Sequence, residues 1–131
     1  MKLKQRLLVV CVFCILWASC NDDESCKAGA GGDVTLVAFP QHHTKPVRPD
    51  SVYVKFDSKE FPGASPLDYD LAIAADTTED HVFIENLKCG DYYIYMIGYD
   101  HSIIELVRGG IPYTIADNLS GEIDLDIPVT E

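Results

Sequence analysis

The histidines of this chain are the residues with the clearest potential for metal binding. His42 and His43 are adjacent, His81 follows two acidic residues, and His101 follows Asp100. Neutral imidazoles together with carboxylates suit Zn²⁺ or Cu²⁺. We take His42, His43 and His81 as the candidate ligands of such a site, with Asp100 and His101 as further candidates. The spacing matches no zinc signature, and adjacent residues on an extended chain point to opposite sides. Solvated or hydrogen-bonded loop histidines are therefore the alternative.

The serines give no sign of nucleophilic catalysis. The sequence contains no Gly-x-Ser-x-Gly motif and no phosphate-binding glycine loop. Ser51, Ser58, Ser65 and Ser102 lie in no motif that would place a base beside the hydroxyl. We predict that the protein is not an enzyme and that it needs no cofactor, a Zn or Cu ion on the histidines being the one exception considered.

The tyrosines form a second group of residues, for which two roles are possible. An exposed aromatic strip would contact a glycan or a peptide. Alternatively, these residues fill the core and flank a sheet, because aromatic residues favour strands. The tyrosines concerned are Tyr53, Tyr92, Tyr93, Tyr95, Tyr99 and Tyr113.

The amino-terminal segment has the pattern of a secretory signal. Residues 1–6 carry three basic residues and no acid, residues 7–19 carry no charge, and Ala18 and Ser19 precede Cys20. This pattern predicts a signal peptide over residues 1–19. The uncharged run is shorter than the roughly 20 residues of a membrane span. The segment resembles a bacterial lipoprotein signal, and this resemblance implies lipidation of Cys20 and attachment to the membrane through acyl chains.

An acidic stretch, Asn21-Asp22-Asp23-Glu24, follows Cys20 directly. It resembles the export signal of Bacteroidetes surface lipoproteins, which implies a lipid anchor in the cell outer membrane and exposure on the cell surface. A solvated acidic tether on the periplasmic side is the alternative. Residues 20–32 end in a glycine-rich run, so we expect a flexible tether before a domain at residues 33–131.

Charge and length limit the function classes. The leader holds three of the ten basic residues and none of the 21 acids, so the other 112 residues carry a net charge of −14. This length suits one domain. Such a charge argues against binding to nucleic acid, which needs clustered Lys or Arg. We expect a non-catalytic module of the cell envelope, structural or binding, whose partner is an envelope protein or a glycan.

Two cysteines, Cys26 and Cys89, remain beyond the predicted lipidation site. In an oxidising compartment an even pair can form a disulfide. Two separate free thiols are the alternative, because a sequence does not contain the Cα separation on which a bridge depends.

The body of the chain reads as short strands separated by turns. Alternating apolar residues recur over several segments, and no window has a helical period. We expect strands at 34–39, 52–56, 67–74, 82–84, 91–99, 103–107, 111–115 and 123–127. Seven or eight short strands in about 100 residues favour a single antiparallel β-sandwich.

A resemblance to known sandwiches lies in residues 82–95. This stretch is similar to the end of a transthyretin-like or Cna-B-type domain. The resemblance implies that Leu87 fills the core, Gly90 makes a tight turn and Tyr92 forms a tyrosine corner, with its hydroxyl bonded to upstream backbone. Short stretches at 39–43, 52–56, 80–82 and 98–100 also resemble small uncharacterised Bacteroidetes lipoproteins, and no activity follows from that resemblance.

Overall fold

The computed structural model describes residues 26–131. The predicted signal peptide, Cys20 and the acidic stretch lie outside the described residues. The strands are β1 (Ala30–His42), β2 (Lys45–Pro46), β3 (Arg48–Phe56), β4 (Leu71–Ala74), β5 (Val82–Leu87), β6 (Gly90–Asp100), β7 (Glu105–Ile115) and β8 (Gly121–Pro128), and a single 3-10 turn, η1, spans Pro66–Asp68. Among these described residues no helix is long and apolar enough to cross a membrane.

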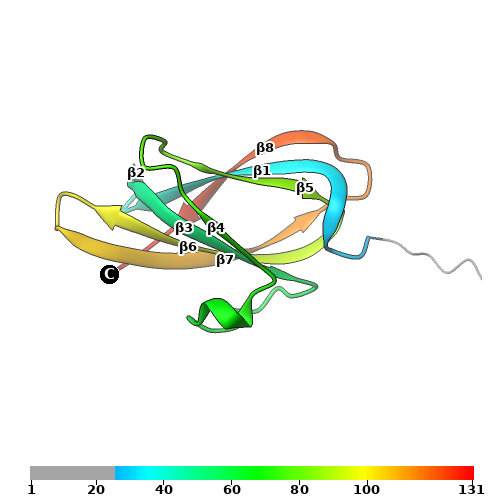
Figure 1. Ribbon diagram of the computed structural model, residues 1–131, viewed down its shortest axis with the longest axis horizontal. Helices are drawn as coiled ribbons and strands as arrows, with labels where there is room; N and C mark the ends of the chain where they lie inside the picture. The colour runs from blue at the N-terminus through cyan, green and yellow to red at the C-terminus, as the bar shows by residue number, and fades with distance from the viewer. Residues whose placement is uncertain (1–25) are drawn as a thin grey trace, which may run out of the picture.

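The strands form two packed layers, which confirms the predicted all-β sandwich (Figure 1). The first sheet contains β2, β1, β5 and β8, and the second has the order β4-β3-β6-β7. One pairing differs from the all-antiparallel arrangement that we expected, because β8 runs parallel to β1 from Val34↔Gly121 to Gln41↔Pro128. Strand direction at this edge is decided by where the chain crosses between the sheets, which strand periodicity does not encode.

The core lies between the sheets and is made by alternate residues of each strand. In β1 the inward row includes Val34, Leu36 and Ala38, and in β6 it includes Tyr92, Ile94 and Met96. The opposite residues of β6, among them Tyr93 and Tyr95, face outward. The period of two that predicted the strands therefore also separates core from surface.

Three predicted strands are divided differently in the structure. The segment expected as a strand at 67–74 begins with η1, and only Leu71–Ala74 pairs with β3. The strands expected at 103–107 and 111–115 are one continuous strand, β7, which pairs with β6 along its whole length. Gly109 and Gly110 looked like a break between strands, but they lie within the ladder.

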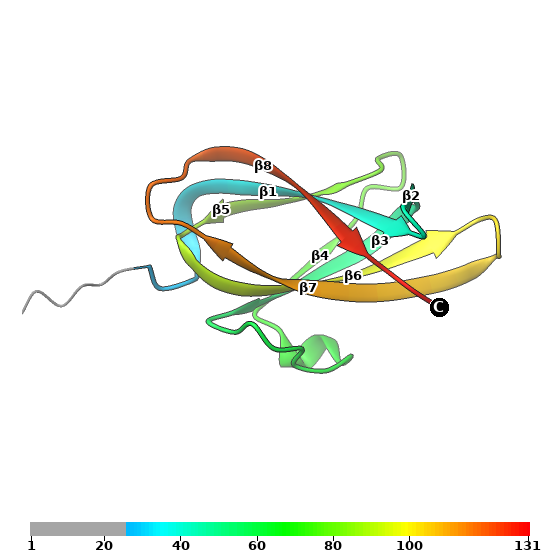
Figure 2. The same cartoon turned by 180° about the vertical axis from the view of Figure 1, so that it is seen from behind.

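The carboxy-terminal segment crosses from the first sheet to the second, as Figure 2 shows from behind. After β8, the amide of Val129 donates to the carbonyl of Gln41 on β1 at 2.9 Å. The next residue, Thr130, exchanges two backbone hydrogen bonds with Arg108 on β7, at 2.7 and 2.8 Å. This segment therefore connects β1 to β7 along one side of the sandwich.

The segment that we expected to be a flexible tether is in part docked onto the domain. Cys26 and Cys89 form a disulfide with a Cα–Cα distance of 4.6 Å. Ala28 is buried, and its amide donates to the Asp57 carboxylate at 3.1 Å. Since β1 already begins at Ala30, the domain boundary lies before residue 33. The glycine-rich composition suggested flexibility, but contacts with distant residues hold this segment.

The tyrosine corner expected from residues 82–95 is present. The Tyr92 hydroxyl donates to the Lys88 carbonyl at 2.6 Å and accepts from the Gly29 amide at 3.0 Å. Leu87 is fully buried, and Gly90 has a φ of 139°, which other residues rarely adopt. This corner attaches the amino-terminal segment to the turn between β5 and β6.

Candidate functional site

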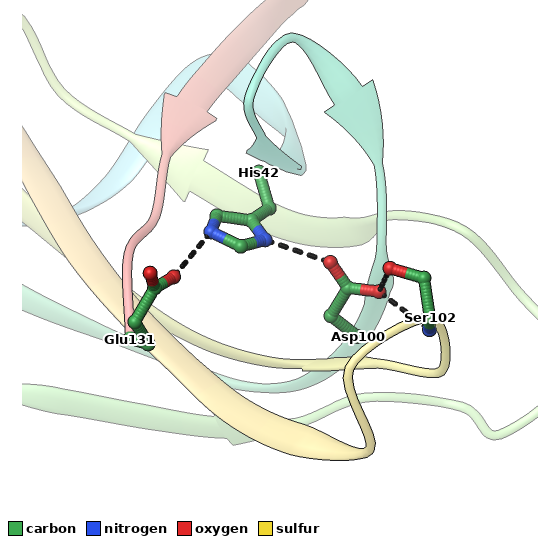
Figure 3. Close-up of polar contacts among 4 residues, drawn as sticks. All are labelled: His42, Asp100, Ser102 and Glu131. Atoms are coloured by element: carbon green, nitrogen blue, oxygen red, sulfur yellow. Dashed lines mark hydrogen bonds and ion pairs between the residues drawn. The ribbon is translucent and has the colours of Figure 1, made fainter.

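Three inward-facing rows of side chains end in polar residues at the same end of the sandwich. His42 closes the inward row of β1, Asp100 closes that of β6, and Glu131 continues the row of Ile127 and Val129 after β8. Because the rows face one another across the core, these three side chains meet at its end, as Figure 3 shows. The apolar patterns that build the core therefore also bring this cluster together.

His42 is the centre of the cluster and is only 4% exposed. Its Nδ1 lies 2.7 Å from Asp100 Oδ2, and its Nε2 lies 2.7 Å from Glu131 Oε2. The contact at Nε2 has the distance of an ion pair but lacks the directionality of a hydrogen bond, so this buried nitrogen has no aligned partner among residues 26–131. Asp100 is held in turn by Ser102, whose hydroxyl and amide donate to Oδ1 at 2.6 and 2.8 Å.

These contacts shift the protonation of all three groups. The hydrogen bond with Asp100 raises the pKa of His42 above its ordinary value of 6.5, although burial opposes this shift. The hydrogen bonds from Ser102, followed by the one with His42, hold the pKa of Asp100 far below its ordinary range. The backbone amide of Glu131 itself, and then His42, lower the pKa of the Glu131 carboxyl.

His43 lies beside His42, contrary to the expectation that adjacent histidines point to opposite sides. Their ring centroids are 4.1 Å apart. The expectation assumed an extended backbone, but His43 and Thr44 form the tight turn between β1 and β2 with φ values of 49° and 65°. Two left-handed residues characterise the type I′ hairpin turn, and this turn brings the His43 ring back over His42.

His81 does not join the other two predicted ligands. Its backbone lies next to the register pair Ala38↔Val82, and its ring packs against the outward-facing rings of Phe39 and Phe83 at 5.3 and 4.7 Å. Its Nδ1 contacts Asp80 Oδ1 at 2.7 Å. The three-histidine site is therefore replaced by two groups, His42 with His43 and Glu131, and His81 with Glu79 and Asp80. His101 is exposed and packs on Tyr99.

The polar chain at His42 has the wrong order for activation of a serine. In a Ser-His-Asp triad the histidine lies between the serine and the carboxylate. Here Ser102 donates to Asp100, and the histidine is on the other side of that carboxylate. The arrangement can hold an oriented imidazole, exchange a proton or bind a cation, but it does not supply a base to the Ser102 hydroxyl.

A second feature with binding chemistry lies on the outer face of the second sheet. An open groove of about 380 Å³ has Phe61, Tyr93 and Tyr95 on one side and Leu106 and Arg108 on the other, with Gly109, Gly110, Thr130 and Glu131 completing its lining. The loop between β3 and β4, which contains η1, lies over this face in Figure 1. A Cβ atom added at Gly110 would meet the Tyr93 ring at 2.7 Å, so this glycine leaves room for that ring.

The rings at this groove belong to a connected aromatic cluster. Phe61 contacts Tyr93 and Tyr95 with centroids 5.8 and 5.5 Å apart, and Tyr95 stacks on Tyr69 at 5.8 Å. Tyr69 also contacts Tyr53 and donates to the Gly63 carbonyl at 2.7 Å. The inner rings hold the loop on the sheet, whereas Phe61 remains 53% exposed. The tyrosines thus fit the second alternative, in which some fill the core and others flank a sheet, with Tyr92 in the core and Tyr93 and Tyr95 at the outer face.

The function of this chain has to be inferred from its fold and from these two sites, because comparison with known proteins gives no match. No family model matches this chain, and neither a curated protein nor a solved structure matches it. The structure defines the chain as an all-β sandwich with a polar cluster at one end and an aromatic groove on one face.

Sequence reasoning named His42, His43 and Asp100 but missed Glu131. A signal was present, because Ile127, Val129 and Glu131 continue one alternating row, as do Met96, Gly98 and Asp100. Following each inward row to its end would have predicted that these carboxylates face His42.

Proposed function

We propose that this protein is a lipid-anchored, non-catalytic binding module of the cell envelope, attached to the outer membrane through Cys20 and displayed on the cell surface. The basic, apolar and small-residue segments before Cys20 support the anchor. The Cys26–Cys89 disulfide agrees with an oxidising compartment. We further propose that the sandwich is of the transthyretin-like or Cna-B type, with the tyrosine corner of Tyr92 in support.

The observation that carries the binding function is the aromatic groove at Phe61. Ligand sites are concave and mainly apolar, with a few polar groups that fix orientation. The groove combines the exposed ring of Phe61 with the charged ends of Arg108 and Glu131. An apolar ring bordered by hydrogen-bonding groups suits a molecule with both an apolar face and hydroxyl groups.

The ligand that we propose is a neutral glycan of the envelope. A sugar ring can place its C–H face on Phe61 and direct its hydroxyls to Arg108 and Glu131. The net charge of −14 outside the leader disfavours polyanionic ligands by long-range repulsion. The open form of the groove also admits a chain that continues beyond the contact residues.

Substitution of Phe61 tests this function. We expect neutral envelope polysaccharides to retard the full-length protein in affinity electrophoresis, and Phe61→Ala to remove that retardation. Phe83→Ala is the matched control, because Phe83 is a similarly exposed phenylalanine on β5 of the opposite sheet. Equal retardation of all three proteins would contradict the groove as the glycan site, and peptide binding without glycan binding would contradict the ligand class.

The anchor has a separate test in cells. Labelled palmitate should be incorporated into the native protein and not into Cys20→Ala, and the native protein on intact cells should be accessible to a membrane-impermeant biotin reagent. Acylation without surface labelling would place the module on the periplasmic side.

A further inference from the structure

The His42 imidazole is oriented in the way that proteins orient a metal-binding histidine. Such a ligand almost always donates one ring N–H to a carboxylate or carbonyl, which leaves the other nitrogen for the metal. Here the Nδ1 of His42 contacts Oδ2 of Asp100, and the Ser102 hydroxyl donates to the other oxygen of that carboxylate. The remaining nitrogen, Nε2, is buried, lacks an aligned hydrogen-bond partner among the described residues and lies 2.7 Å from Glu131 Oε2 (Figure 3).

Two further ligand atoms lie close to this nitrogen. One ligand atom each from His42, His43 and Glu131 can be chosen so that all three lie within 4.8 Å of one another. Ligands of a tetrahedral Zn²⁺ at about 2.0–2.1 Å would be roughly 3.3 Å apart. The exposed side chains of His43 and Glu131 can make this adjustment by rotation, while the buried His42 stays in place.

The backbone that supports this cluster is strained on both sides. Thr44, which follows His43, has a φ of 65°, and Ile104, in the turn after Asp100, has a φ of 59°. Left-handed conformations are rare for β-branched residues, and such strain concentrates at functional sites. In this molecule the strained turn at 43–44 is what places the His43 ring over His42.

We propose that His42, His43 and Glu131 bind a divalent metal ion of the Zn²⁺ or Cu²⁺ class, with Asp100 and Ser102 orienting His42. Two imidazoles and one carboxylate match these borderline ions and not Ca²⁺ or Mg²⁺, which prefer oxygen ligands. Three protein ligands leave a tetrahedral ion with one further position. The site shares Glu131 with the lining of the aromatic groove but takes His42 and His43 from outside it, and it differs from the three-histidine set expected from the sequence.

The other group of ligand-type residues, Glu79, Asp80 and His81, carries no such proposal. It has one imidazole, its two acids are exposed, and it contains no buried unpartnered atom. It therefore provides a control of similar composition within the same molecule.

Titration with metal alone tests the site. We would use tag-free full-length protein in mild detergent at pH 7.5 and measure Zn²⁺ by competition with a chromophoric chelator. We expect one Zn²⁺ per protein, loss of this binding in His43→Ala and in Glu131→Gln, and unchanged affinity in His81→Ala. Asp100→Asn should weaken Zn²⁺ by about 10–100-fold while the three ligands remain, since it removes only the orienting carboxylate.

Copper gives a spectroscopic readout that a purely structural role would not change. The electron paramagnetic resonance spectrum of bound Cu²⁺ should contain hyperfine coupling from two imidazole nitrogens, and from one in His43→Ala. Both His43 and Glu131 are exposed, so these variants should fold even if His42→Ala does not. Absence of Zn²⁺ binding, or binding lost in His81→Ala and retained in His43→Ala and Glu131→Gln, would overturn the proposal.

Discussion

At the scale of single residues, His42 determines the chemistry of this molecule. Its ring lies between two carboxylates, and these stabilise whichever cation its Nε2 carries. In the absence of metal that cation is a proton, and the hydrogen bond with Asp100 raises the pKa of His42. Protonated His42 in turn adds to the lowering of the pKa of Asp100 by Ser102 and of the pKa of Glu131 by its own backbone amide. A metal ion must displace this proton, so metal affinity should fall as the pH is lowered through the pKa of His42.

The same contacts predict how stability depends on pH in metal-free buffer. A histidine whose pKa is raised on folding stabilises the protein fully below the unfolded value of about 6.5, and this stabilisation is lost as the pH rises through the higher folded value. Asp100 and Glu131 act in the opposite sense, since their stabilisation is lost only in acid, below the ordinary carboxyl range.

We therefore expect the stability difference between the native protein and His42→Gln to shrink as the pH rises above about 6.5. Urea unfolding in EDTA between pH 5.5 and 9 measures this difference, and other groups cancel because both proteins contain them. His101→Gln, at an exposed histidine beside the same turn, is the matched control. A difference that stays constant across this range would show that the carboxylates do not stabilise protonated His42.

At the scale of secondary structure, the segment after β8 is the element on which the polar cluster depends. It leaves β1 at Gln41, pairs with Arg108 of β7 and places Glu131 beside His42. The pairing requires close approach at Gly109. A Cβ atom added there would overlap the carbonyl oxygen of Pro128 and approach the Cα of Val129, and backbone cannot move aside as a flexible side chain can.

Gly109→Ala should therefore separate this segment from β7 and lower the free energy of unfolding by about 1–3 kcal/mol, the usual range for overpacking. Urea unfolding gives the free energy, and faster hydrogen exchange of the Thr130 amide would locate the change. Glu105→Ala, on the exposed side of the same strand, is the control and should change stability by less than about 0.5 kcal/mol. If Gly109→Ala leaves Thr130 exchange unchanged, the crossing segment does not depend on this glycine.

At the scale of the whole molecule, a small core is reinforced by a covalent link. The Cys26–Cys89 disulfide spans 63 positions of the sequence and attaches the start of the domain to the turn between β5 and β6. The tyrosine corner of Tyr92 ties the same two regions through Gly29 and Lys88. Such a link matters for a domain of this size, because a domain of about 110 residues is only marginally stable.

The double variant Cys26→Ala/Cys89→Ala should lose about 4 kcal/mol of stability, because a cross-link over a loop of this length limits the entropy of the unfolded chain. Urea unfolding measures the loss, and the native protein in reducing agent serves as the comparison. Both should unfold at similar urea concentrations. Equal stability of the native protein with and without reducing agent would mean that the link does not constrain the unfolded state.

Much of this architecture follows from local patterns in the sequence. Alternation with a period of two is a property of each strand by itself, so it predicted the sandwich and a strand at 34–39, whose inward row continues to His42 in the structure. The tyrosine corner was predicted from the resemblance of residues 82–95 to known sandwich domains, and its bond between Tyr92 and Lys88 lies within one turn of the chain. Patterns of this kind are determined by residues that are close together in the sequence.

Tertiary structure decided which of these residues meet. The strand spacing could not show that β8 runs parallel to β1, that its continuation brings Glu131 to His42, or that His81 faces outward beside Phe39. Nor could it show the left-handed turn at His43, because that conformation is imposed by the short hairpin between β1 and β2. Such contacts join residues up to 89 positions apart, and only the packing of two sheets brings them within bonding distance.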